Sequence, residues 1–325
     1  MGMAIARYRR QGEDAVHWGE WQGGQVYPLA TAARTHQALM AEYFQDPQGL
    51  RARRAADAPL APADITLLSP IDSNVQLFCQ GLNYAEHREE SGASAAAEEE
   101  SLLFMKAASS ICGPNDTILR PRGCELLDYE IELALVLKRD IAAPVHIAEA
   151  DLPEYVGGLV LCNDVSARDL MFGAPMLQWF RGKSQRTFCP MGPILYLLDA
   201  EDFHQLYHFK LELKVNGAVR QSATTADLIH RPAPTLTSIA SFADMQTGDC
   251  LLTGTPGGVL AGSNLKVALA ILANFRNDRK RREKFTQAQL ARERFLQPGD
   301  VLELSIVSED GAIDLGRQRN VIADA

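Results

Sequence analysis

Hydrophobic and polar residues alternate most regularly between Asp128 and Lys138, which read DYEIELALVLK. Successive side chains of a β-strand point to opposite faces, so one face of the predicted strand carries Ile131, Leu133, Leu135 and Leu137. Glu130 and Glu132 lie on the other face, roughly 6.6 Å apart along the backbone. Two carboxylates beside apolar side chains need a positive partner, and a divalent metal with oxygen ligands is one. The alternative is a solvated face of an edge strand.

Patterns elsewhere predict an α+β fold in which strands predominate. Residues 1 to 30 predict short strands around a turn at Gly23 and Gly24, and residues 31 to 54 predict one or two helices. The segment 209–215 alternates before the hairpin turn Asn216-Gly217, and 301–307 alternates after a Pro-Gly-Asp turn. We therefore predict a small N-terminal α/β domain at 1–68 and a catalytic domain at 69–325. Leu265, Leu269, Leu272 and Phe275 recur at helical spacing and predict a helical insertion at 263–295.

Composition narrows the classes of partner. A formal net charge of -9 over 325 residues argues against nucleic acid, since phosphate binding needs a basic surface. The basic cluster Arg279 to Arg282 is better explained as the solvated face of a helix. No apolar run approaches the roughly 18 residues that span a bilayer. Six scattered cysteines without a C-x-x-C pair predict reduced thiols and a cytoplasmic protein.

Two further segments carry acids and a histidine. The apolar run Val156 to Cys162 ends in Asn163 and Asp164, which is a common way to deliver a metal ligand or a catalytic carboxylate. A structural ion pair between Asp164 and Arg168 is the alternative. His87 and Glu90 are three residues apart, so a helical turn places them on one face, where a carboxylate can raise the basicity of an imidazole. The alternative is an ordinary surface helix with incidental His and Glu, which is the commoner explanation of this spacing taken alone.

A lysine and a glycine-rich loop add candidate anion contacts. Lys183 follows Gly182 in a predicted turn flanked by aromatic residues, but Leu177 replaces the glycine that a phosphate-binding loop needs. The segment CLLTGTPGGV at 250–259 predicts a strand that leads into a loop of three glycines and two threonines. Such loops bring backbone amides and hydroxyl groups close to an anion.

The ordered combination of several segments resembles the fumarylacetoacetate hydrolase superfamily, over about residues 75 to 321. These segments are GLNYAEHREE, DYEIELALVL, NDVSARD, GKSQRTFCPMGP, TGTPGGV, LQPGDVLEL and LGRQRNV. The resemblance implies a mixed β-roll catalytic domain, a homodimer and one Mg²⁺ or Mn²⁺ ion for each subunit. It assigns the metal to Glu130, Glu132 and Asp164.

The resemblance also implies roles for the remaining candidates. His87 and Glu90 match a His/Glu pair of the acylpyruvate-hydrolysing members, and Arg168 and Lys183 match catalytic cations. The implied substrate contacts are Thr255, Lys106, Tyr84 and Gly254. One departure is Met171, where hydrolytic members often carry Gln three residues after the matched arginine.

These assignments predict a metal-dependent hydrolase that cleaves a carbon–carbon bond in an acylpyruvate-type β-diketo acid. A small anionic 2-oxo acid is the expected substrate, with no nucleic acid or membrane partner. Decarboxylation or keto–enol isomerisation of oxaloacetate-like or longer 2-oxo-dioate substrates is an alternative, and Met171 favours it because neither reaction needs an attacking water. Hydration of a dienoate is a third enzymatic possibility. The alternative outside the enzymes is a non-catalytic protein that binds a metal or a small acid.

Overall fold

A mixed β-sheet forms the centre of the computed structural model, which describes the chain except residues 56–58, 93–100, 173–176, 264–273 and 275–276. Within the described residues this sheet has ten strands, and β4 (Ile65–Leu68) joins it by pairing with β1. The other strands follow in spatial order: β3 (Gln25–Pro28), β2 (His17–Gln22), β1 (Met3–Arg10), β14 (Ile194–Leu197), β11 (Val156–Asn163), β10 (Ile131–Leu137), β17 (Cys250–Leu252), β5 (Leu77–Gly81) and β6 (Leu102–Lys106). Most neighbours are antiparallel, whereas β17 and β5 are parallel. The predicted strand-dominated α+β fold is confirmed.

The acid-bearing strand β10 lies in the interior of this sheet, between β11 and β17. All of its residues are buried, and its two faces contribute to two different cores. Ile131, Leu133, Leu135 and Leu137 belong to one core, as the alternation predicts, whereas Ala134 and Val136 belong to the other. The alternative of a solvated edge strand is therefore wrong, because both neighbouring positions are filled by strands.

A second sheet packs against the first and closes the fold. Within the described residues it has five strands in the order β16 (Ala218–Thr224), β15 (Phe209–Val215), β18 (Val301–Ser308), β19 (Asp314–Asp324) and β8 (Ile118–Arg120). The hairpin from β15 to β16 turns at Asn216 and Gly217, as predicted, and both residues have positive φ. Two short pairs complete the strands: β9 (Leu127–Asp128) with β12 (Ser166–Ala167), and β7 (Ile111–Cys112) with β13 (Cys189–Pro190).

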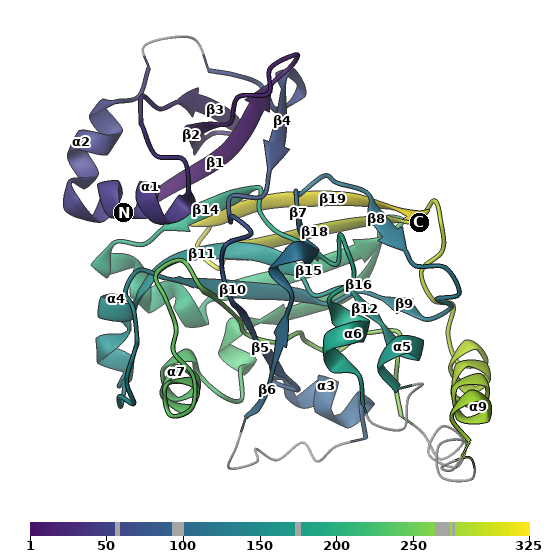
Figure 1. Ribbon diagram of the computed structural model, residues 1–325. Helices are drawn as coiled ribbons and strands as arrows, with labels where there is room; N and C mark the ends of the chain where they lie inside the picture. Colours follow the sequence, from purple (N-terminus) through teal and green to yellow (C-terminus); the bar gives the residue numbers. More distant parts are fainter. Residues whose placement is uncertain (56–58, 93–100, 173–176, 264–273, 275–276) are drawn as a thin grey trace.

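The helices divide between two ends of the molecule (Figure 1). Helices α1 (His36–Gln45) and α2 (Pro47–Ala52) accompany the N-terminal strands at the top of the view, and they confirm the helices predicted for 31–54. At the opposite end lie α3 (Ala85–Glu90), α5 (Arg168–Phe172), α6 (Trp179–Lys183) and α9 (Asp278–Leu290). The described residues also contain α4 (Leu152–Tyr155) and α7 (Pro232–Ala240). No described helix is long and apolar enough to cross a membrane.

The structure describes only part of the predicted helical insertion at 263–295. Leu265, Leu269, Leu272 and Phe275, whose spacing predicts its first half, lie outside the described residues. The second half contains helix α9, and the assignment of 263–295 as an insertion stays a prediction. The predicted solvated face is wrong at Arg281, which is only 3% exposed.

The N-terminal segment is joined to the rest of the chain by strand pairing and by a partly buried charge cluster. Strand β1 pairs with β14, so the central sheet runs across the predicted boundary at residue 68, and that boundary stays a prediction. The junction cluster consists of Arg7, His36 and Asp72. Arg7 Nη2 lies 2.7 Å from Asp72 Oδ1, and the backbone N–H of His36 donates to Asp72 Oδ2 over 2.8 Å. The His36 ring lies 3.1 Å from both Asp72 Oδ2 and the carbonyl oxygen of Gly248.

Candidate metal centre and active site

Three carboxylates meet where β10 begins and β11 ends. The two strands are antiparallel, so the end of β11 lies beside the start of β10, and the Asp164 N–H donates to the Glu130 carbonyl over 2.8 Å. One oxygen each from Glu130, Glu132 and Asp164 lies within 4.8 Å of the others. Glu130 is 4% exposed, Glu132 1% and Asp164 0%. The sequence prediction that these acids converge is confirmed, and their number and type suit a hard divalent cation.

Three cations surround the carboxylates. Lys183 Nζ lies between Glu130 Oε2 and Asp164 Oδ2, at 2.7 and 2.6 Å. Lys106 Nζ lies 2.5 Å from Asp164 Oδ1 and also donates to the carbonyl of Lys183. Arg168 is the third cation, and its partners identify a fourth acid.

The guanidinium of Arg168 bridges two acids of the same strand region. Its Nε lies 2.9 Å from Asp128 Oδ2 and its Nη2 lies 2.5 Å from Glu130 Oε1. The alternative of an Asp164–Arg168 pair is therefore wrong. Asp128 is a site residue that the sequence reasoning missed, although it stands two residues before Glu130 and continues the same alternation. We define the site cluster as Lys106, Asp128, Glu130, Glu132, Asp164, Arg168 and Lys183.

The charges of the site cluster shift the pKa values of its two glutamates in opposite directions. Burial alone raises the pKa of Glu130, but the charges of Lys183 and Arg168 overcome burial and lower it to about 2. Burial and the charges of Asp164 and Glu130 raise the pKa of Glu132 well above its usual value. Among the described residues no lysine or arginine pairs with Glu132, whose Oε2 accepts the Gly254 N–H over 2.7 Å. Glu132 therefore has no cationic partner among the described residues, and a bound divalent cation would supply one. The three carboxylates fit such an ion.

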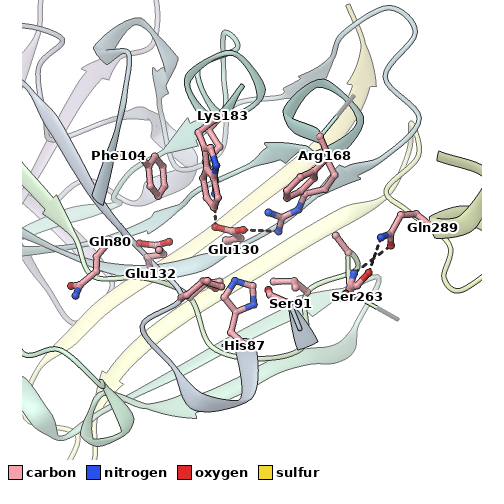
Figure 2. A pocket seen from close by; sticks show the side chains of 18 of the residues that line it. Gln80, His87, Ser91, Phe104, Glu130, Glu132, Arg168, Lys183, Ser263 and Gln289 are labelled. Atoms are coloured by element: carbon pink, nitrogen blue, oxygen red, sulfur yellow. Dashed lines mark hydrogen bonds and ion pairs between the residues drawn. The ribbon is translucent and has the colours of Figure 1, made fainter. Parts of the chain in front are cut away.

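His87 and Glu90 lie on α3, and His87 lies below Glu130 in the view of Figure 2. His87 is 7% exposed and lines the pocket, and its Nδ1 has no hydrogen-bond partner within the described part of the chain. Glu90 Oε2 lies 3.8 Å from that nitrogen, which is too long for a hydrogen bond. Its carboxylate instead accepts the Gly258 N–H over 2.9 and 3.1 Å. The structure thus brings the predicted pair together and ties it to the glycine-rich loop.

The glycine-rich loop follows β17 and contacts the carboxylates through the Gly254 N–H, which donates to Glu132. Gly254 has a φ of +93°, and a Cβ there would lie 2.8 Å from Asn83 and 2.9 Å from the Gln80 carbonyl, so only glycine fits. Thr255 lines the pocket and donates to the Ile131 carbonyl over 2.9 Å. Tyr84 is 2% exposed, and its hydroxyl has no partner among the described residues. Of the four predicted substrate contacts, Thr255 is the one that reaches the pocket surface, and Lys106, Tyr84 and Gly254 lie deeper.

One prediction about the 168–183 region needs correction, and the surroundings of Met171 become clear. Gly182 and Lys183 do not form a turn but end helix α6. Gly182 is required there because a Cβ would lie 2.1 Å from Met171 Cγ. Met171 is fully buried against this helix and is not a residue of the pocket wall. Its departure from the usual glutamine therefore changes helix packing in addition to polarity.

The pocket above the site cluster has a volume of about 230 Å³. Besides the acids, cations and His87, its wall contains residues that the sequence reasoning missed: Gln80, Phe104, Phe172, Trp179, Phe285 and Gln289. These come from five separate elements, β5, β6, α5, α6 and α9. No local motif connects them, so their sequence positions carried no signal of a shared site.

Comparisons with known proteins agree on one family. The family model described as "Fumarylacetoacetate (FAA) hydrolase C-terminal" matches residues 76–323. Bovine mitochondrial oxaloacetate tautomerase FAHD2A is 34% identical over 243 residues, which cover 73% of this chain and 75% of the relative.

Two solved structures match over nearly the whole chain and confirm the fold. A probable 2-hydroxyhepta-2,4-diene-1,7-dioate isomerase from Mycobacterium abscessus has a TM-score of 0.74 and 28% identity, and the match covers 100% of this chain and 99% of that one. A fumarylacetoacetate hydrolase from Exiguobacterium antarcticum has a TM-score of 0.72 and 28% identity, covering 99% and 100%. These names are enzyme names, which supports an enzyme over a non-catalytic binding protein.

Proposed function

The chain belongs to the fumarylacetoacetate hydrolase family, and we propose that it is a divalent-metal-dependent tautomerase that interconverts keto and enol forms of a 2-oxo acid. The observation that carries the proposal is the buried group of Glu130, Glu132 and Asp164, with the imidazole of His87 in the same pocket. Tautomerisation needs an electron sink and a proton carrier but no attacking water. The name of the bovine relative supports the same class of reaction.

Mg²⁺ or Mn²⁺ is the cofactor that suits the three carboxylates. Hard divalent cations prefer oxygen ligands, and Glu130, Glu132 and Asp164 would hold the ion. When bound, the ion would act as a Lewis acid for negative charge that develops on the keto oxygen of the substrate. Arg168 and Lys183 compensate the surrounding acids, so an anionic substrate can enter a pocket that contains several carboxylates.

His87 is the residue that we assign to proton transfer. Its buried ring lies across Glu130 from Lys183 and Arg168 in Figure 2, on the open side of the carboxylates. An imidazole in this position can take a proton from the carbon next to the keto group and return it. Glu90, held by the Gly258 N–H, is a positioning residue whose carboxylate lies 3.8 Å from Nδ1 of the ring.

Hydrolysis of an acylpyruvate is the second candidate, and the same His87–Glu90 pair favours it because a histidine beside a carboxylate can also activate water. Met171 does not decide between the two reactions, because its side chain is buried against α6 and does not line the pocket. The two reactions share the metal and the pocket, so only their products distinguish them.

The test is an assay of enol oxaloacetate and enol phenylpyruvate with and without added Mn²⁺, together with product analysis on an acylpyruvate. We expect Mn²⁺-dependent decay of the enol absorbance and no cleavage products. Glu130→Gln is the matched control and should remove the metal dependence. If the acylpyruvate yields two acids while enol decay is not accelerated, the chain is a hydrolase.

The assembly and the compartment are also part of the proposal. We assign a homodimer, as implied by the family resemblance, and light scattering of the purified chain tests it. All six cysteines are free thiols, which favours a reducing compartment such as the cytoplasm.

A further inference from the structure

Four aromatic side chains from four separate elements form a row along one wall of the pocket. Phe104 of β6 lies 5.1 Å from Trp179 of α6, Trp179 lies 6.5 Å from Phe172 of α5, and Phe172 lies 5.4 Å from Phe285 of α9, measured between ring centroids. All four rings line the pocket. The row starts at the site cluster, because Lys183 Nζ lies 5.1 Å from the Phe104 ring centroid.

Helix α9 supplies the far end of this row and is fixed in place. Phe285 and Gln289 are one helical turn apart, 3% and 1% exposed, and both face the pocket. The Gln289 amide donates to the Gly262 carbonyl over 2.7 Å and accepts the Gly262 N–H over 3.3 Å, which joins α9 to the end of the glycine-rich loop. Arg282 binds Asp169 of α5 over 3.2 Å. Phe285 is therefore a rigid element of the wall.

The charges of the pocket lie at the opposite end of this row. Among the described wall residues the cationic side chains are Arg168 and Lys183, with His87 as the third titratable nitrogen group. Arg168 and Lys183 already pair with the buried acids. A second substrate carboxylate placed against Phe172 and Phe285 would lose its hydration without gaining a cation from these residues. An apolar group there would gain burial and ring contacts.

We infer that the aromatic row and α9 form a tail subsite that selects 2-oxo acids with an uncharged aromatic or bulky apolar tail over those with a second carboxylate. This inference rests on the proposed function, which places the 2-oxo acid head at the three carboxylates. It names the substrate class more narrowly than the family does. It also makes Phe285 a specificity-determining residue contributed by the helical insertion.

The experiment compares three probes that share one head group and differ in the tail. Oxamate has no tail, N-phenyloxamate carries a phenyl ring and N-oxalylglycine carries a carboxymethyl group. Calorimetric titration of the Mn²⁺-loaded chain measures their dissociation constants. We expect N-phenyloxamate to bind at least ~10-fold more tightly than oxamate, since filling an apolar subsite changes affinity by this order. N-oxalylglycine should bind no better than oxamate.

Two variants locate the subsite. Phe285→Ala should weaken N-phenyloxamate by ~10-fold and leave oxamate unchanged, and Phe285→Leu should restore most of the loss. Phe180→Ala is the matched control, because Phe180 is an aromatic residue of α6 that is 60% exposed and does not line the pocket. It should bind all three probes like the parent chain. Circular dichroism checks that each variant is folded.

The outcomes separate the two levels of the proposal. If oxamate fails to bind in the presence of Mn²⁺, the head site and the proposed function are wrong. If oxamate binds but N-phenyloxamate binds no better, or N-oxalylglycine binds best, the tail subsite is wrong while the head site stands. Loss of N-oxalylglycine binding in Arg292→Gln would then identify the alternative, since Arg292 lies 3.2 Å from Gln289 Oε1.

Discussion

The site cluster and the junction cluster both bring acids and cations together, but the site cluster is buried, the junction cluster is partly buried, and their charges are balanced differently. In the junction cluster a single acid, Asp72, is matched by Arg7, by the His36 ring and by the backbone N–H of His36. In the site cluster four acids face three cations, and Glu132 has no cationic partner among the described residues. A cluster in which acids and cations compensate each other stabilises the contact between elements. Buried acids in excess of the cations are costly, unless a bound metal ion supplies the missing positive charge. The comparison predicts that substitutions in the site cluster will lower activity, whereas substitutions in the junction cluster will lower stability alone.

The largest effect on activity is expected for Glu132→Gln. If Glu132 is one of three metal ligands, as proposed, its removal should lower kcat/KM by more than ~100-fold, since even residues behind metal ligands account for 10- to 100-fold. The metal-free variant should unfold at the same or a higher temperature, because an acid whose pKa is raised by its neighbours has been removed. Activity assays with Mn²⁺ and thermal unfolding without metal measure both quantities. Full activity, or a clearly lower unfolding temperature, would contradict the role assigned to Glu132.

Lys183→Met should harm both stability and activity. It leaves Glu130 and Asp164 without the cation that lies between them, and breaking a buried ion pair costs about 3–5 kcal/mol of unfolding free energy. Added Mg²⁺ or Mn²⁺ should restore more stability to this variant than to the parent chain, because the ion replaces the missing charge. Urea unfolding with and without metal is the measurement. Equal metal stabilisation of both chains would show that the ion binds elsewhere.

Asp72→Asn should weaken the fold while leaving the chemistry intact. Burial raises the pKa of Asp72, but hydrogen bonds from His36 and the charge of Arg7 outweigh burial and lower it overall. A lowered folded pKa means that the stabilisation is present above the unfolded pKa of about 3.9 and is lost as the pH falls through the folded value. We expect a loss of ~1–3 kcal/mol at pH 7 with kcat unchanged. The unfolding free energies of the two chains should converge below about pH 4, and a constant difference down to pH 3 would contradict this account.

The smallest effect is expected for Met171→Gln, which restores the residue typical of hydrolytic relatives. The position packs against Gly182 and does not reach the pocket. A buried amide without partners should therefore cost ~1–3 kcal/mol of stability, with little change in activity. Unfolding experiments and acylpyruvate product analysis test this. Appearance of cleavage products would mean that the side chain can reach the substrate.

Local patterns predicted the parts of the fold that depend on neighbouring residues in sequence. Alternation identified β10 and its two faces, and the Asn216-Gly217 turn located a hairpin. The three metal-ligand candidates were within reach because two share one strand and the third ends its antiparallel neighbour. Asp128 could have been added from the same alternation.

The apolar half of the pocket could not be predicted in this way. Phe104, Phe172, Trp179 and Phe285 meet through packing of elements that are far apart in sequence, and each alone looks like an ordinary core residue. The packing of α5, α6 and α9 beside β6 brings these rings together. Such packing has no signature in a short window of sequence.

The pairing of β1 with β14 has a practical consequence for dissecting this protein. A shortened chain that starts at residue 69 would leave one flank of β14 without hydrogen-bond partners and uncover the leucines that Ile5 and its neighbours now shield. Unpaired strand flanks recruit other chains, so such a fragment should precipitate or form aggregates instead of behaving as an independent enzyme. Anyone who wishes to isolate the chemistry should keep the first seventy residues attached.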